Sequence, residues 1–553
     1  MSDDMEILKA LPVLQKIWNT GTLQDYFKKT IEPLSQMETF LEKKIMIMAI
    51  SEEAKRLYGK EVAQEVSMQM DNLPIIETGT HLAFLRDYDT PRKTDLRSRL
   101  NQNVLISSAL LQMLGQKYHI GVYGSNVTLN HPCGGGYFQL GDEIFPVTLP
   151  KQIGQVCLYD ATGITPNYFN KALPLVAKLK MLDSVLVPEA INKTQTPRKE
   201  MLFKTKKIVT SLLAPINNGK ANYETVEKQY RTLNPTNLNF VKSAMLDFSA
   251  DAYRKYGYTF SDVDRQYQEL TSIFGRKDLK LSDQVALVQS QTINKALEGS
   301  DINHISVDAV EVVRKFLIMS LENENSLWYK VFSNLGNFKK MQKSFIGIRG
   351  SWKEDESPFD YVARDNGFSK CVSLPLTEIE HKPETLLSLL KNRKIIPSSA
   401  LMVLLFQSSG IMAHGGFFQT TYADKLKNRF GEYLQNIGEE KREKNLQKLP
   451  VDMALLSLAI QTDISGQPMK LSEISRMPLE KKRELIKKIP EYPSCRAVVN
   501  ALPVLGKYLD STAPGYVQTE AINHNMPYLV CCHEQISQMF SNIQRCHFYT
   551  RSA

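Results

Sequence analysis

Apolar side chains recur at helical spacing through the first 70 residues. The stretches "DDMEILKALPVLQKIW", "LQDYFKKTIEPLSQMETFLEKKIMIMAI" and "EEAKRLYGKEVAQEVSMQM" place them three and four positions apart, with few residues that break helices. This pattern predicts a helical N-terminal segment over residues 1–70.

The pattern changes after this segment. "LPIIETGTHLAFLRD" opens as a short apolar strand, "TDLRSRLNQNVLISSALLQMLGQK" has helical periodicity, and "HIGVYGS" is a second apolar strand. A strand, a loop, a helix and a second strand make up the unit from which parallel sheets are built. Residues 71–163 are therefore predicted to form the first part of an α/β core. This part is expected to end in a hairpin or return strand in "YFQLGDEIFPVTLPKQIGQVCLYD".

Helical periodicity dominates the middle of the chain, residues 164–340, which we expect to be a helical insertion or lid. Residues 341–435 are predicted to return to the core, with "ALMVLLF" (400–406) as a buried strand and "QTTYADKLKNRF" as a helix. Residues 436–553 are again predicted to be helical. The fold class expected is therefore α/β: a parallel-sheet core with a large helical middle region and a helical C-terminal part.

Composition limits the classes of protein that fit. With 553 residues and 42% hydrophobic side chains, the chain can bury sizeable cores, and no run approaches the roughly 20 apolar residues of a membrane helix. A net charge of +9 with interleaved acids and bases does not favour nucleic-acid binding. Seven cysteines, two of them adjacent at Cys531 and Cys532, suit a reducing compartment, so we expect a cytoplasmic protein. No CxxC pair occurs, so a structural zinc site has little support, and no metal is expected.

Three stretches place polar side chains or glycines at predicted strand ends, where parallel sheets bind ligands. The first is "ETGTHLAF". Thr78 and Gly79 expose backbone N–H groups and permit close approach of a ligand, and His81 can exchange a proton near neutral pH. A turn glycine beside a surface histidine is the alternative interpretation.

The second stretch is "GSNVTLNHPCGGGYF". Its glycines favour a loop that closes over a substrate, and the alternative is a flexible surface turn. Neither GxGxxG nor GxxxxGK[ST] occurs, so a standard dinucleotide or P-loop phosphate site is not supported. The candidate residues are Asn126, Thr128, Asn130, His131, Gly134 and Gly135.

The third stretch is "GIMAHGGFFQTTYADKL". His414, Gly415 and Gly416 form a turn before a helix that Thr420 could cap, and a helix N-terminus favours an anion. A tight turn with a helix cap explains the same residues without a ligand.

These stretches resemble the bacillithiol synthase family, the bacterial enzymes that add cysteine to glucosaminyl-malate. The resemblance lies in "IIETGTHLAFLRD", in the following helix and "HIGVYGS", and in "IIPSSALMVLLFQSSGIMAHGGFFQTTYADKLKNRF". It departs at "SNVTLNHP", where the family has an Asp-His-Asp cluster. The resemblance implies a Rossmann-like core and an enzyme that joins a group to a small metabolite.

We therefore expect a ligase or group transferase that condenses an amino acid or similar nucleophile with a carboxylated or phosphorylated small molecule. His81, His131 and His414 are the predicted catalytic residues, and the other candidates would bind substrate. The sequence does not identify a cofactor, which could be a nucleotide. It is also compatible with a homodimer. The alternative function is a non-enzymatic interaction protein that uses aromatic residues of the helical middle region, such as Tyr253 and Trp328.

Overall fold

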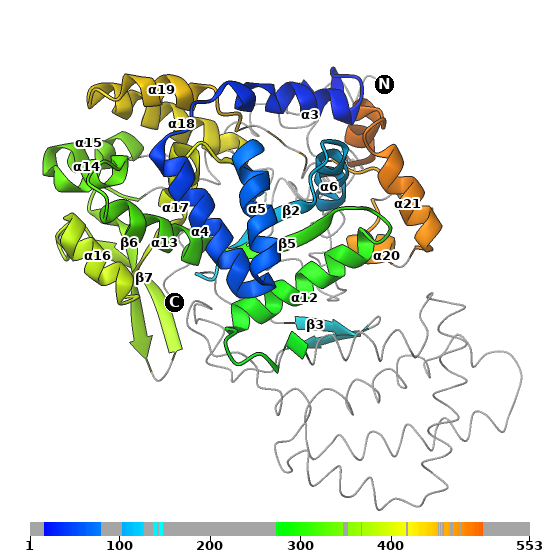
Figure 1. Ribbon diagram of the computed structural model, residues 1–553, viewed down its shortest axis with the longest axis horizontal. Helices are drawn as coiled ribbons and strands as arrows, with labels where there is room; N and C mark the ends of the chain where they lie inside the picture. The colour runs from blue at the N-terminus through cyan, green and yellow to red at the C-terminus, as the bar shows by residue number, and fades with distance from the viewer. Residues whose placement is uncertain are drawn as a thin grey trace, which may run out of the picture.

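A computed structural model of the chain (Figure 1) describes the following residues: 16–78, 102–126, 137–140, 143–146, 272–346 except 274, 352–365, 368–415, and 419–501 except 452, 454, 456, 457, 465–467 and 476. The architecture is mixed α/β, with a parallel sheet among many helices.

The N-terminal part is helical from residue 23 to residue 72, as predicted, and residues 1–15 of the predicted segment lie outside the described part of the chain. Its elements are α3 (Leu23–Ile31), the short 3-10 helix η1 (Glu32–Gln36), α4 (Leu41–Tyr58) and α5 (Lys60–Asn72). A reciprocal cap starts α3, because Asp25 N donates to Thr22 Oγ1 over 3.3 Å and Thr22 N donates to Asp25 Oδ2 over 3.1 Å. Gly59, at φ +98°, separates α4 from α5, and the two helices pack together as the blue pair at the centre of Figure 1.

A four-stranded parallel sheet forms the centre of the fold. Its strands are β1 (Ile75–Glu77), β2 (Tyr118–Tyr123), β5 (Asn303–Asp308) and β9 (Met412–His414). The order across the sheet is β5-β2-β1-β9, and each pair of neighbours is parallel. This confirms the predicted α/β class with a parallel sheet, including the strands expected at "PIIE" and "HIGVY".

The predicted strand at residues 400–406 is wrong, because this run belongs to helix α17 (Ser399–Ser408). Ser398 caps the helix by accepting a hydrogen bond from Leu401 N at 3.4 Å, and Ala, Leu and Met are strong helix formers. Most of the helix is buried, so its sequence is apolar on nearly all sides. It therefore lacks the helical spacing of apolar residues by which a helix is distinguished from a strand. The strand next to it is β9, which follows Gly410 at φ +70°.

Strand β5 lies inside residues 164–340, a range that we expected to be helical. Its sequence, "NHISVD", alternates polar and apolar side chains, and α13 (Ala309–Leu321) begins at the next residue. Asp308 ends the strand and caps the helix, since its Oδ1 accepts from Val310 N at 3.0 Å. The central sheet therefore draws one of its strands from the middle of the chain.

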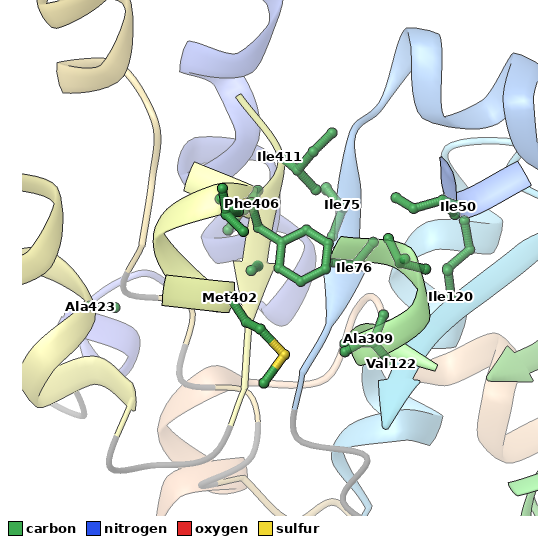
Figure 2. Packing of buried hydrophobic residues seen from close by; sticks show 14 of the residues in the cluster. Ile50, Ile75, Ile76, Ile120, Val122, Ala309, Met402, Phe406, Ile411 and Ala423 are labelled. Carbon is green, nitrogen blue, oxygen red and sulfur yellow. The ribbon is translucent and has the colours of Figure 1, made fainter. Parts of the chain in front are cut away.

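The two faces of the sheet differ in chemistry. One face is apolar and joins a buried cluster with residues of α4, α13 and α17; Figure 2 shows Phe406 of α17 close to Ile76 of β1. The other face carries polar side chains beneath α6 (Asn103–Met113) and α12 (Leu281–Ala296). Layers of helices on both faces bury the sheet, as parallel sheets require.

The remaining elements surround this core. Antiparallel β6 (Glu356–Asp365), β7 (Phe368–Pro375) and β8 (Ile395–Pro397) form a second sheet in the order β7-β6-β8, close to α14 (Leu327–Ser333), α15 (Leu335–Phe345) and α16 (Pro383–Lys391) (Figure 1). The predicted hairpin is confirmed as β3 (Tyr137–Leu140) with β4 (Glu143–Pro146). Helices α18 (Gln419–Asn436), α19 (Glu440–Gln447), α20 (Leu471–Ser475) and α21 (Leu479–Lys488) follow. Across the part of the chain that the structure describes, no helix is both long enough and apolar enough to cross a membrane.

Packing of α17 against the core leads to a stability prediction. Leu405 is fully buried in α17, whereas Leu335 at the start of α15 is 60% exposed. Leu405→Ala should lower the free energy of unfolding by about 2–5 kcal/mol, and the matched Leu335→Ala change by less than about 1 kcal/mol. Urea titrations of both variants measure the difference, and equal losses would contradict the placement of α17.

Candidate functional site

The order of the strands creates a topological switch point between β1 and β9, where the direction in which strands are added to the sheet reverses. From β1 the chain adds β2 and then β5 on one side, and it later returns to add β9 on the other side of β1. In open α/β sheets the loops after two such strands run in opposite directions, and ligands bind in the crevice outside their carboxyl ends. Here the two strands that define this point are β1 and β9.

Residues from both strands meet at the switch point. Thr78 directly follows β1, and His414 and Gly415 end and follow β9. The Thr78 N–H donates to the His414 carbonyl oxygen at 2.6 Å, and the Thr78 hydroxyl donates to the same oxygen at 3.1 Å. The backbone at this edge is therefore fixed by two hydrogen bonds between segments that are distant in sequence.

A row of polar side chains crosses the buried polar face of the sheet, from the last residues of β9 and β1 to the amino-terminal halves of β2 and β5. The row consists of His414 on β9, Glu77 on β1, His119 on β2 and His304 on β5, and it is called the polar row below. Glu77 pairs in register with His414, and His119 with His304. Glu77 also pairs with Gly121, which is two residues from His119, so all four side chains share one face. All four are buried. Strands of a buried parallel sheet are normally apolar on both faces, so this row departs from the rule.

Hydrogen bonds run along the row without interruption from β1 to β5. His119 Nε2 lies 2.7 Å from Glu77 Oε2, and His119 Nδ1 lies 2.7 Å from His304 Nδ1. His304 Nε2 in turn lies 2.8 Å from Ser306 Oγ. Where two ring nitrogens meet, one must carry the proton and the other must accept it, so the tautomers of the two histidines are coupled.

Helix α6 holds the carboxylate in this row. Asn103 Nδ2 donates to Glu77 Oε1, and Ser107 Oγ lies 3.3 Å from Glu77 Oε2 and 2.9 Å from His119 Nε2. Burial raises the pKa of Glu77, but electrostatic interactions with His119 and His414 and hydrogen bonds from His119 and Asn103 together outweigh burial and leave that pKa below its usual value. Glu77 is therefore ionised near neutral pH although it is fully buried.

His414 stands at the other end of the row, at the switch point. Burial lowers the pKa of its imidazole to about 4, opposed by the Glu77 carboxylate, so the ring is neutral at pH 7. Its Nδ1 has no hydrogen-bond partner among the residues that the structure describes. One ring nitrogen of His414, one of His119 and one oxygen of Glu77 lie within 4.8 Å of one another. A neutral imidazole beside a carboxylate can accept a proton or bind a cation.

A second buried carboxyl group lies at the carboxyl end of β5. Asp308 Oδ1 accepts from Val310 N and, at 3.4 Å, from Ser125 N, while Oδ2 has no partner among the described residues. Burial raises the pKa of Asp308 to about 7; Lys280 opposes this shift, whereas Glu311 and Glu53 add to it. Asp308 is therefore partly protonated near neutral pH.

The structure brings three of the predicted site residues together: Thr78, His414 and Gly415. Asn126 follows β2 at the same edge of the sheet, half-buried, and Thr420 lies in the first turn of α18. The catalytic and binding roles given to these five residues remain predictions. The other predicted site residues lie outside the described part of the chain: His81, His131, Gly79, Thr128, Asn130, Gly134, Gly135 and Gly416.

Sequence reasoning missed three members of the polar row, Glu77, His119 and His304. Their signal is present in the strands themselves, "IIE", "YHIGVY" and "NHISVD", where a polar side chain stands at a position that a buried parallel strand would fill with an apolar one. Once the strands are known, these polar residues at buried positions identify the row. His414 was identified only because glycines follow it.

Comparison with protein-family models, with curated proteins and with solved structures finds no match.

The pKa of Asp308 predicts how stability varies with pH. A carboxyl group whose pKa rises from 3.8 to about 7 on folding stabilises the fold fully below pH 4, and this stabilisation is lost as the pH rises through 7. Asp308→Asn keeps an acceptor for the helix cap but cannot ionise. Relative to the wild type, its free energy of unfolding should increase by about 1–3 kcal/mol between pH 5 and pH 8. Urea titrations at four pH values test this, and a difference that does not vary with pH would contradict it.

Proposed function

We propose that the chain is a cytoplasmic enzyme of small-molecule metabolism with a Rossmann-like core. In this proposal it is a ligase or group transferase, and it condenses an amino acid or similar nucleophile with a small carboxylated or phosphorylated metabolite. The observation that carries the proposal is the meeting of Thr78, His414 and Gly415 at the switch point between β1 and β9. Numbered along the chain, the four strands stand in the order 3-2-1-4, which occurs in the Rossmann fold, and that fold binds its ligands at this point.

The chemistry at this point suits a condensation. An attacking amine or thiol must lose a proton, and the acceptor must be made more electrophilic. His414 is neutral at pH 7 and lies beside the ionised Glu77, so it can take up a proton or take part in holding a cation near the reacting group. Helix α18 begins at Gln419, four residues after Gly415, and the N-terminus of a helix can bind a carboxylate or phosphate.

The resemblance to the bacillithiol synthase family supports the same proposal. Its three stretches contain β1, β2 and β9, which are three adjacent strands of the parallel sheet. The likeness therefore concerns the part of the chain that builds the switch point. The departure at "SNVTLNHP" follows β2, so the substrate is proposed only as a chemical class.

An interaction protein that uses aromatic side chains of the middle region gains less support. Trp328 is fully buried, and its ring stacks on Phe430 of α18 with centroids 5.9 Å apart. Its Nε1 donates to Ser408 Oγ at 3.2 Å. Trp328 therefore belongs to the core and cannot form part of a partner surface.

An untargeted activity assay tests the proposal. The purified protein is incubated with a bacterial metabolite extract, with and without added ATP and amino acids, and the small molecules are followed by mass spectrometry. We expect the wild type to consume two metabolite ions and to form one whose mass is their sum less that of the displaced group, such as water or phosphate; where ATP is required, its cleavage products also form. His414→Asn should reduce this turnover at least about 100-fold, because it removes the imidazole at the switch point.

His381→Asn is the matched control. His381 is also buried, but it contacts Ser357 and Phe338 beside the second sheet. This variant should keep wild-type turnover. An extract that stays unchanged under every condition would contradict the proposed enzyme, and equal losses in both variants would contradict the placement of the site.

A further inference from the structure

We propose that Glu77, His119 and His414 bind one divalent transition-metal ion of the zinc type. The three residues lie on the adjacent strands β2, β1 and β9, and each offers a ligand atom within 4.8 Å of the other two. Each side chain is at least 97% buried. This proposal goes beyond the proposed function, because it concerns binding of the ion alone.

The donor set indicates the class of ion. Two imidazole nitrogens and one carboxylate oxygen are ligands that Zn²⁺ and other divalent transition metals accept, whereas Mg²⁺ and Ca²⁺ prefer oxygen donors. In a tetrahedral zinc site, ligand atoms stand about 3.4 Å apart, because each lies about 2.0–2.2 Å from the ion. The separation of 2.7 Å between His119 Nε2 and Glu77 Oε2 is that of a hydrogen bond, so the ion would replace the shared proton and move these atoms slightly apart. Three protein ligands leave a fourth position for water or substrate.

The surroundings of His119 and Glu77 match what metal ligands require. Ligating histidines usually donate their second N–H to a neighbouring acceptor, and ligating carboxylates accept hydrogen bonds on the other oxygen. His119 Nδ1 lies 2.7 Å from His304 Nδ1, and Glu77 Oε1 accepts from Asn103 Nδ2. These contacts fix the orientation of both ligands without using His119 Nε2 or Glu77 Oε2.

An ordinary buried ion pair explains the group less completely. His119 and Glu77 satisfy one another, but His414 is not required for their contact. A buried imidazole nitrogen without a hydrogen bond is costly, and His414 Nδ1 has no partner among the described residues. A cation between the three side chains accounts for the position of His414 beside a buried carboxylate.

Binding of the ion is tested directly on the full chain. The protein is treated with a chelator, dialysed and titrated with Co²⁺ and with Zn²⁺, with Mg²⁺ as a control ion. We expect about one Co²⁺ to bind per chain, with the visible absorption bands that are typical of four- or five-coordinate Co²⁺. Zn²⁺ should displace the bound Co²⁺, and Mg²⁺ should not compete with it. Absence of saturable binding by the folded wild type would overturn the proposal.

Conservative variants locate the site. Glu77→Gln and His414→Asn should each weaken Co²⁺ binding at least about 100-fold, and His381→Asn, a buried histidine outside the group, should leave it unchanged. Circular dichroism checks that each variant is folded. Binding by both ligand variants at wild-type affinity, or an equal loss in His381→Asn, would overturn the assignment.

X-ray absorption at the zinc edge covers the case in which the ligand variants do not fold. For the wild type loaded with one equivalent of Zn²⁺, we expect two imidazole ligands and oxygen donors. Sulfur ligands, which the cysteines of the chain could supply, would overturn the proposal. Because neither measurement uses a substrate, failure of the metal site and failure of the proposed enzyme activity are distinguishable.

Discussion

The site depends on the parallel pairing of β1 with β9. This pairing joins Thr78 to His414, residues 336 positions apart, and it aligns Glu77 with His414 on one face of the sheet. Only three residues of each strand take part, so their position is held largely by the buried side chains around them. Helix α17 precedes β9 and packs in this core, which links the stability of the core to the geometry of the switch point.

The polar row occupies strand positions that carry apolar side chains in most buried parallel sheets. Burying an ionised carboxylate and three imidazoles opposes folding unless each group finds a partner. The fold supplies partners from α6, from β5 and within the row, and only the Nδ1 atom of His414 lacks one among the residues that the structure describes. Departures from local folding rules are expected at functional sites, because there ligand binding rather than stability selects the residue. The exception in this row lies at the switch point itself.

The sequence predicts the α/β class, the N-terminal helices, two of the sheet strands and the hairpin, because their periods and turn residues are local signals. It does not predict that residues 400–406 are helical, since a short run buried on most sides has no period. It also misses β5, because the partners of "NHISVD" lie far away in the sequence. Thr78 and His414 could be identified from the glycines beside them. Glu77, His119 and His304 could not be grouped before the register of the sheet was known.

The central claim is that the fold presents a neutral imidazole with an available nitrogen at the switch point. Nitrogen NMR of protein labelled with ¹⁵N only in histidine tests this claim most directly, because the ring shifts distinguish protonated from unprotonated nitrogens. The resonances of His414 are assigned by their loss in His414→Asn. The account predicts a ring with one unprotonated nitrogen that shows no titration between pH 5.5 and pH 8. A charged imidazolium at pH 7, or titration near pH 6.5, would contradict it.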